Sequence, residues 1–211
     1  MTLDPLPYDI AEAEAHLRAA DPRLSALIDE IGPGANGFGL RAMETVPALV
    51  RAITYQQLST KAAGTIHGRV LDLLGEEPTP EAILAQTDET LRSCGLSRQK
   101  TAAVQDLARL AQDVIVPTRT ELAAMPDEEV IQRLVTVRGV GVWTARMFLL
   151  FTLGRPDVWA PGDLGLREGL RVMLGAEERP TPKEFEVAGE PFRPWRSVAS
   201  WYLWRATELG R

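Results

Sequence analysis

The sequence is poor in the residues from which metal centres and disulfide frameworks are built. Its 211 residues include one cysteine, Cys94, and two histidines, His16 and His67. A single cysteine excludes a disulfide framework, a thiolate zinc site and a four-cysteine iron–sulfur cluster. Two histidines are too few for a histidine-rich metal site.

Long apolar runs are also absent. The longest, Met147–Leu153, is far shorter than the roughly 20 residues that cross a bilayer. The N-terminal segment is acidic, whereas an export signal has a basic start followed by an apolar core. These absences predict a cytoplasmic protein that does not bind membranes.

The sequence also lacks an excess of basic residues. Its 23 Lys and Arg and 29 Asp and Glu give a net charge of −6. Net charge is a weak argument against a nucleic-acid ligand, because the local field over one face decides phosphate binding. Arginines outnumber acidic residues between Arg133 and Arg171. A solvated basic face and a phosphate-binding face both remain open.

Hydrophobic residues recur at the spacing of helices. Val46, Leu49, Val50 and Ile53 fall at i, i+3, i+4 and i+7, which is one buried helical stripe, and several later segments repeat the pattern. Alternating strand patterns are nearly absent, and glycine and proline clusters such as Gly32–Gly39 separate the segments. The sequence therefore predicts an all-α protein of one domain or two small ones.

The most informative segment is LVTVRGVGVWTARMFLLF, Leu134–Phe151. A helix ends near Val137, a tight turn follows, and a second helix starts at once. Gly139 and Gly141 permit positive φ and close backbone approach, and the first amides of the second helix form an anion site. On this segment alone, a plain αα-hairpin and a phosphate-binding hairpin both remain open.

A carboxylate follows the hairpin in the segment DVWAPGDL, Asp157–Leu164. Asp163 comes after Pro-Gly and before an amphipathic helix. An N-cap is the simplest role for an aspartate at such a junction, because its side chain accepts hydrogen bonds from the first amides of the helix. Taken alone, this segment favours the N-cap over a catalytic role.

Together, the hairpin, the Gly/Pro-rich loop and the aspartate resemble the helix–hairpin–helix DNA glycosylase superfamily. Within it the chain resembles the 3-methyladenine DNA glycosylase II (AlkA-type) branch, through Arg51–Val70, Gly95–Ala108 and Arg193–Thr207. The resemblance runs from near residue 10 to the C-terminus. Larger bacterial members carry an additional N-terminal β-rich domain, so this chain resembles a compact form.

The resemblance implies two helical lobes with an active-site cleft between them. Residues 46–155 would hold a wedge loop and the helix–hairpin–helix motif, and residues 1–45 and 156–211 would form the second lobe. Asp163 matches the family's catalytic aspartate, which faces an oxocarbenium-like sugar. At about 4 Å and an effective dielectric near 20, a carboxylate contributes about 4 kcal/mol, or roughly a thousandfold in rate. Whether Asp163 also activates water stays open.

The segment Gln56–Ser59 occupies the place of the family's wedge loop. Leu58, with Gln57, would fill the gap left by an extruded base, and Ser59 would also contact DNA. Burying a leucine recovers about 1.5–3 kcal/mol, comparable with the few kcal/mol that extrusion costs. The alternative is that Leu58 merely ends the stripe of the preceding helix.

In the hairpin, Gly139 and Gly141 match glycines whose amides hold a DNA phosphate in the family, with Arg138 and Thr144 as further DNA contacts. The resemblance implies no required cofactor. A structural monovalent cation, Na⁺ or K⁺, is the one ion that it suggests, because in relatives the backbone carbonyls at three hairpin positions bind one. These positions are Val135, Val137 and Val140.

Position 143 bears on the reaction type. Bifunctional relatives that cut the strand through a Schiff base have a lysine there, whereas this chain has Trp143, which implies a monofunctional enzyme. Trp143 and Trp204 match base-binding aromatics, which suit a flipped cationic purine. Met147 stands where some relatives have a tyrosine, and Tyr55 is a further candidate. Core packing is the favoured role for Trp195 and Trp201.

The expected function is excision of alkylated bases, of the 3-methyladenine and 7-methylguanine type, from double-stranded DNA, leaving an abasic site. The expected state is a nucleoid-associated cytoplasmic monomer, and lesion preference stays open. Three alternatives remain: a non-catalytic helix–hairpin–helix DNA-binding module, a glycosylase for a deaminated base such as hypoxanthine or uracil, and a helical scaffold with no nucleic-acid role.

Overall fold

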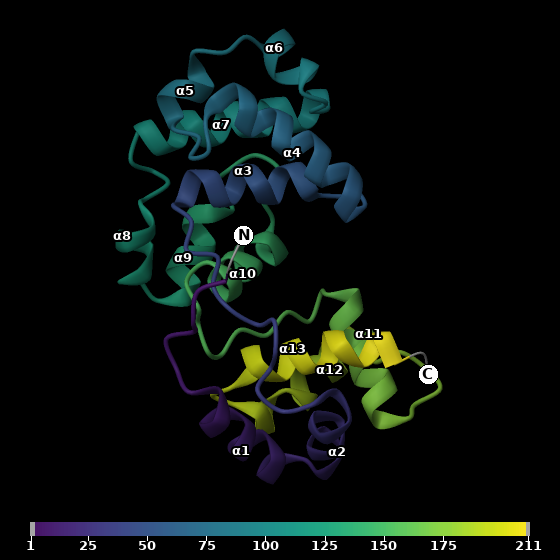
Figure 1. Ribbon diagram of the computed structural model, residues 1–211. Helices are drawn as coiled ribbons and strands as arrows, with labels where there is room; N and C mark the ends of the chain where they lie inside the picture. The colour runs from purple at the N-terminus through teal and green to yellow at the C-terminus, as the bar shows by residue number, and fades with distance from the viewer. Residues whose placement is uncertain (1–2, 210–211) are drawn as a thin grey trace. The chain divides into compact units, whose positions relative to one another are not determined.

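The computed structural model describes residues 3–209, and these form a helical fold (Figure 1). Within this range the extended structure is limited to an isolated antiparallel bridge between Asp4 and Leu40. The predicted all-α class is confirmed.

The helices follow one another along the chain, with the longer connections at residues 32–44 and 152–163. Their bounds are α1 (Ile10–Ala20), α2 (Pro22–Ile31), α3 (Thr45–Tyr55), α4 (Thr60–Leu74), α5 (Pro80–Leu84), α6 (Asp88–Ser93), α7 (Arg98–Gln112), α8 (Arg119–Ala123), α9 (Asp127–Leu134), α10 (Val142–Phe151), α11 (Leu164–Leu174), α12 (Pro182–Ala188) and α13 (Arg196–Ala206), with the 3-10 helices η1 (Glu190–Phe192) and η2 (Thr207–Leu209).

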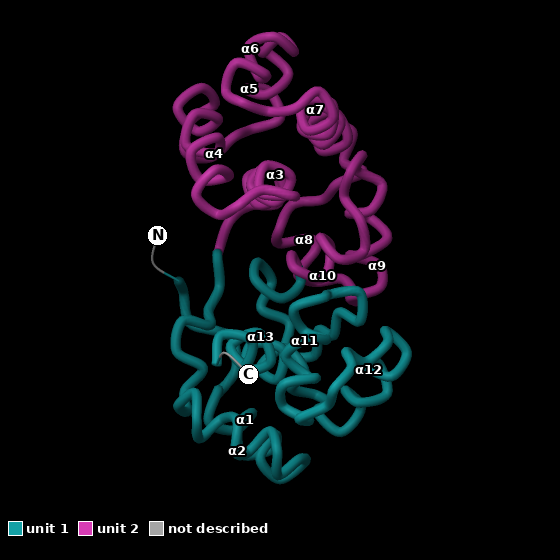
Figure 2. Tube along the Cα trace, turned by 90° about the vertical axis from the view of Figure 1, so that its right-hand side faces the viewer, with its two compact units in different colours: residues 1–41, 149–211 teal, residues 42–148 magenta. Residues whose placement is uncertain are grey.

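The chain divides into two compact units (Figure 2). Unit 1 contains residues 1–41 and 149–211, and unit 2 contains residues 42–148. The division therefore comes after Arg41 and after Phe148, whereas the sequence placed it after residues 45 and 155. The second boundary falls inside α10, which runs from Val142 to Phe151, and not in the loop that follows this helix.

The core of unit 2 forms around α3, which packs against α4 and α7. The helical stripe read from the sequence is the buried face of α3, because Leu49, Val50 and Ile53 are at most 1% exposed. Helix α7 contributes Val104 and Leu107 to the same core. Apolar residues at helical spacing therefore create the platform that carries the loops at the ends of α3.

The core of unit 1 depends on a close crossing of α11 and α13. Gly169 makes this crossing possible, because a Cβ at this position would overlap the carbonyl oxygen of Leu203. Helix α13 is buried on almost every side, as expected for a helix inside a core. The N-terminus of α11 is thereby held against the C-terminal part of α13.

Two features are absent from residues 3–209. No helix between residues 3 and 209 has the length and apolar character that a bilayer crossing requires. In the same range, His, Cys, Asp and Glu side chains do not gather in groups of three or more that could hold a metal ion.

Candidate active site and nucleic-acid interface

Asp163 caps the N-terminus of α11 and also contacts a tryptophan. Its Oδ1 accepts the backbone N–H of Leu166 at 2.8 Å, and the indole Nε1 of Trp204 donates to the same oxygen at 3.2 Å. The residue is 8% exposed. The N-cap is therefore confirmed, and it does not exclude a second role, because the cap holds a carboxylate beside an aromatic ring.

Small residues on α11 bring Asp163 and Trp204 together. A Cβ at Gly165 would lie 3.2 Å from both Asp163 Oδ1 and Trp204 Cδ1, which is tighter than ordinary contact. One turn later, Gly169 allows the backbone of α13 to approach. The sequence predicted Asp163 and Trp204 as site residues separately, and the structure places them in contact within unit 1.

The connection between α3 and α4, which the family resemblance identifies as the wedge loop, is exposed at residues 57–59. Leu58 lies outside both helices and is 40% exposed, so it does not end the stripe of α3, and that alternative is wrong. Gln57 has a φ of +57°, which a residue other than glycine adopts at an energetic cost. Ser59 caps α4 by accepting the N–H of Ala62 at 3.3 Å.

The hairpin between α9 and α10 is a tight turn closed by the Val140 N–H, which donates to the carbonyl of Val137 at 3.0 Å. Gly139 has a φ of +77° and therefore needs glycine. Gly141 has no left-handed φ, but a Cβ there would meet no atom within 4 Å, so the backbone is open beside it. The exposed residues of the turn include Arg138.

The remaining predicted residues of unit 2 differ in exposure. On α10, Trp143 is 48% exposed and Met147 is half-buried on the same face, at i and i+4. Thr144 is only 5% exposed, so its side chain lies in the interior and only its amide stays a candidate DNA contact. Tyr55 packs under the guanidinium of Arg51 at 4.2 Å from the ring centroid.

Tyr55 also contacts a histidine from α4. The Tyr55 and His67 rings meet edge to face at 5.9 Å between centroids. Burial, with a smaller effect of Arg51, lowers the pKa of His67 from its usual value of 6.5, so the neutral form is favoured. Both of these ring contacts of Tyr55, with Arg51 and with His67, therefore lie within unit 2.

The chain matches known proteins over most of its length. Residues 50–194 match the family of HhH-GPD superfamily base excision DNA repair proteins. A DNA-3-methyladenine glycosylase 1 from Schizosaccharomyces pombe is 33% identical over 202 residues, which cover 95% of this chain and 89% of the relative. The chain belongs to the HhH-GPD superfamily.

Solved structures agree with this assignment. The structure of a 3-methyladenine DNA glycosylase from Schizosaccharomyces pombe in complex with abasic DNA matches with a TM-score of 0.86 and 33% identity, covering 94% of this chain and 98% of that one. A DNA-3-methyladenine glycosidase from Bacillus halodurans matches with a TM-score of 0.82 and 32% identity, covering 98% and 92%. Both relatives therefore share the HhH-GPD fold over nearly the whole chain.

Beside the Asp163–Trp204 pair lies an aromatic stack that no sequence pattern of this HhH-GPD chain suggested. The Trp204 and Phe151 rings stack at 5.8 Å with an angle of 21°, and Phe38 meets Phe151 edge-on at 6.2 Å. The guanidinium of Arg41 lies 5.0 Å from the Phe151 centroid. These residues come from distant segments and lack a shared spacing, so only the folded chain reveals them.

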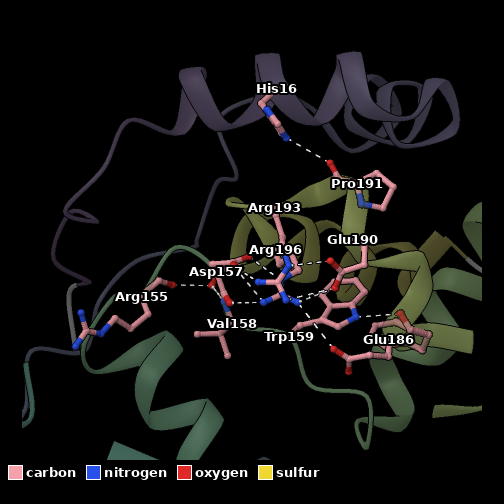
Figure 3. A network of polar contacts seen from close by, with 12 residues as sticks. His16, Arg155, Asp157, Val158, Trp159, Glu186, Glu190, Pro191, Arg193 and Arg196 are labelled. Atoms are coloured by element: carbon pink, nitrogen blue, oxygen red, sulfur yellow. Dashed lines mark hydrogen bonds and ion pairs between the residues drawn. The ribbon is translucent and has the colours of Figure 1, made fainter. Parts of the chain in front are cut away.

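The segment that leads to Asp163 is braced by α13 and by Arg193, which precedes this helix. Arg196 donates from Nε to Asp157 Oδ1 at 2.6 Å, and Arg193 Nη1 donates to Oδ2 at 2.7 Å (Figure 3). The Ser197 hydroxyl donates to the carbonyl of Arg155 at 2.6 Å and accepts the N–H of Val158 at 2.9 Å. Arg196 is buried and Asp157 is partly exposed, so their ion pair is only partly shielded from water.

A second brace comes from α12. The Trp159 ring stacks on Phe185 at 4.2 Å, and its Nε1 donates to the Phe185 carbonyl at 3.0 Å. Trp159 therefore has a structural role, as does Trp201, which is buried and packs edge-on against Tyr202. Core packing, the role favoured for Trp201 by the sequence, is confirmed by its burial. These contacts hold residues 155–159, the segment that precedes Asp163.

Proposed function

We propose that this protein is a monofunctional DNA glycosylase that extrudes alkylated bases from duplex DNA and removes them by hydrolysis, leaving an abasic site. The observation that carries the proposal is the buried Asp163 carboxylate, held by a helix amide and by the Trp204 indole, in a chain of the HhH-GPD base excision repair family. The names of the relatives support substrates of the 3-methyladenine type. Substrates of the 7-methylguanine type are part of the proposal through the family resemblance.

Hydrolysis breaks the bond between the sugar C1′ and the base nitrogen, whose electron pair leaves with the base. A cationic alkylpurine becomes neutral as it leaves, so no general acid has to protonate it. The sugar is then electron-poor, and the fixed Asp163 carboxylate stabilises that charge. Water adds to C1′ and releases one proton to the solvent. Because Asp163 is preorganised by α11 and Trp204, it needs no rearrangement at this step.

Extrusion is assigned to the exposed loop between α3 and α4. Leu58, with Gln57, would fill the space that the base leaves, while the amides around Gly139 and Gly141 would hold the phosphate of the same strand. Trp204, which contacts Asp163 within unit 1, would supply an aromatic face for the extruded purine. Trp143, exposed on α10 of unit 2, stays a predicted base-binding aromatic. With tryptophan at position 143, no lysine at this position can form a Schiff base, and the strand is left intact.

A monovalent cation at the hairpin fits the residues present. Backbone carbonyls are hard oxygen ligands, and the Val137 carbonyl, which accepts one N–H, has a second lone pair. The carbonyls of Val135, Val137 and Val140 would hold such an ion. When bound, it would offset phosphate charge. We place the enzyme, as a monomer, on DNA in the cytoplasm.

The decisive experiment incubates the protein with methylated duplex DNA and identifies released bases by mass spectrometry. We expect free 3-methyladenine and 7-methylguanine, with a strand that breaks only after alkali treatment. Release of hypoxanthine or uracil alone, from duplexes that carry these bases, would assign the enzyme to deaminated lesions. Tight DNA binding without base release would identify a non-catalytic module.

A further inference from the structure

In unit 2, one helix contacts both the wedge loop and the hairpin. Near the start of α7, the Nζ of Lys100 donates to the carbonyl oxygens of Thr54 and Gln56, each at 2.8 Å. These carbonyls lie at the C-terminal end of α3, where backbone oxygens lack partners within the helix and a cation suits the helix dipole. Lys100 therefore fastens the point at which the wedge loop begins.

The hairpin is attached to the same helix two turns later. Asp106 Oδ2 accepts the backbone N–H of Arg138 at 2.8 Å. Between the two attachments, Ala103 lies near Gly139: a Cβ on the glycine would be in ordinary contact with the alanine methyl, at 3.6 Å. Lys100, Ala103 and Asp106 follow one another at i, i+3 and i+6, and the outer two are separated by about 9 Å along the helix axis.

A third contact joins the two loops directly. The side-chain Nε2 of Gln56 donates to the carbonyl of Gly139 at 3.0 Å. All of these hydrogen bonds have a backbone group as one partner, so each one fixes the course of the main chain. The left-handed φ of the next residue, Gln57, is a conformation that persists only where its surroundings hold it.

We propose that Lys100, Asp106 and Gln56 are positioning residues for base extrusion. They set the spacing between the wedge, Gln57–Leu58, and the phosphate-binding turn, Gly139–Gly141. This inference rests on the proposed function of both loops as DNA contacts. Extrusion turns a nucleotide about its backbone, so the side chain that enters the duplex must lie at a fixed distance from the phosphate that the turn grips. Helix α7 maintains that distance.

The test uses a duplex in which 2-aminopurine is placed beside an abasic-site analogue. Its fluorescence rises when the wedge enters the duplex and unstacks the probe. Lys100→Met keeps the aliphatic stem and removes the N–H donors. Because hydrogen bonds from charged donors are strong, we expect the rise to be about tenfold slower or more, with affinity for undamaged duplex changed by less than about twofold. The control Lys183→Met, at an exposed position of α12, should behave as the wild type.

A double variant tests whether the two attachments act as one device. Asp106→Ala should also slow insertion, and Lys100→Met combined with Asp106→Ala should be slower by less than the product of the two single effects. The reason is that loss of either attachment alone already frees the distance between the wedge and the turn. Independent, multiplicative effects would overturn the proposal. If Lys100→Met does not fold by circular dichroism, Gln56→Ala carries the same test from a half-buried position.

Salt dependence separates positioning from direct phosphate binding. A lysine that gripped a phosphate would lower the slope of log K against log salt by about one when removed, and normal insertion with that result would overturn the proposal. The assay requires no base release. A wild-type chain that inserts its wedge yet releases no base from methylated DNA would refute the proposed function and leave this inference standing.

Discussion

At the scale of single residues, Asp163 combines a structural and a chemical role that substitutions can separate. Asparagine keeps an acceptor for the Leu166 amide and for Trp204 but removes the charge, whereas alanine removes both. We expect Asp163→Asn to reduce single-turnover base release roughly a thousandfold, from the loss of a charge at about 4 Å. Asp163→Ala should additionally lower the free energy of unfolding by about 1 kcal/mol, as measured in denaturant.

The matched pair also identifies the result that would contradict a catalytic role. If Asp163→Asn retains base release and stability while Asp163→Ala loses both, the residue acts as an N-cap alone, because the cap survives in the asparagine variant and the charge does not. Duplex affinity close to the wild-type value, combined with lost release, is the expected result.

At the scale of helices, the crossing of α11 and α13 decides where Asp163 meets Trp204. Gly169→Ala places a methyl group on the Leu203 carbonyl, so we expect a loss of about 1–3 kcal/mol in the free energy of unfolding and a weaker base release. Gly68→Ala is the control, because Gly68 lies in α4 with no atom within 4 Å of a new Cβ. Gly68→Ala should raise the free energy of unfolding by about 0.5–1 kcal/mol.

Denaturant unfolding, monitored by tryptophan fluorescence, gives the free energy of unfolding of both variants. Base release is measured in parallel. Equal stability of the two glycine variants would show that α13 retreats from the methyl group at little cost. The crossing would then have no part in holding the carboxylate beside the indole. A loss of release in Gly169→Ala without a loss of stability would place the effect at Asp163 itself.

The helices and the hairpin were predictable because their signals are local. The spacing of Leu49, Val50 and Ile53 predicted the buried face of α3, and the two glycines predicted the turn before α10. Contacts that join distant segments leave no such spacing. Lys100 and Asp106 look like ordinary polar residues of an amphipathic helix, and only the fold brings their side chains to backbone groups more than thirty residues away.

The residues around Asp163 in unit 1 were also only partly predictable from the sequence. The Pro-Gly-Asp junction before α11 marked Asp163, and the family resemblance marked Trp204. No local pattern pointed to Phe38 or Phe151. The sequence around a lone aromatic in a loop or at a helix end does not show whether its ring stacks on another. Local patterns therefore identified the carboxylate, and long-range packing supplied its surroundings.

At the scale of the whole molecule, charge distribution matters more than net charge. The chain carries a net charge of −6, yet the hairpin turn presents an exposed arginine, Arg138. Several other arginines of the described chain are committed to acidic partners, such as Arg196 to Asp157 and Arg171 to Glu168. A phosphate ligand would therefore be attracted by a local field, which salt screens strongly.

Duplex affinity should consequently fall steeply with salt, because each neutralised phosphate releases counterions. We expect log K to fall linearly with log salt, and Arg138→Ala to reduce the slope by about one, with similar effects on damaged and undamaged sequences. Fluorescence anisotropy at a series of salt concentrations measures this slope. Lys183→Met, on the exposed surface of α12, is the matched loss of one positive charge and should leave the slope unchanged. An unchanged slope in Arg138→Ala would remove Arg138 from the phosphate interface, because a contact that releases no counterion is not a contact with phosphate.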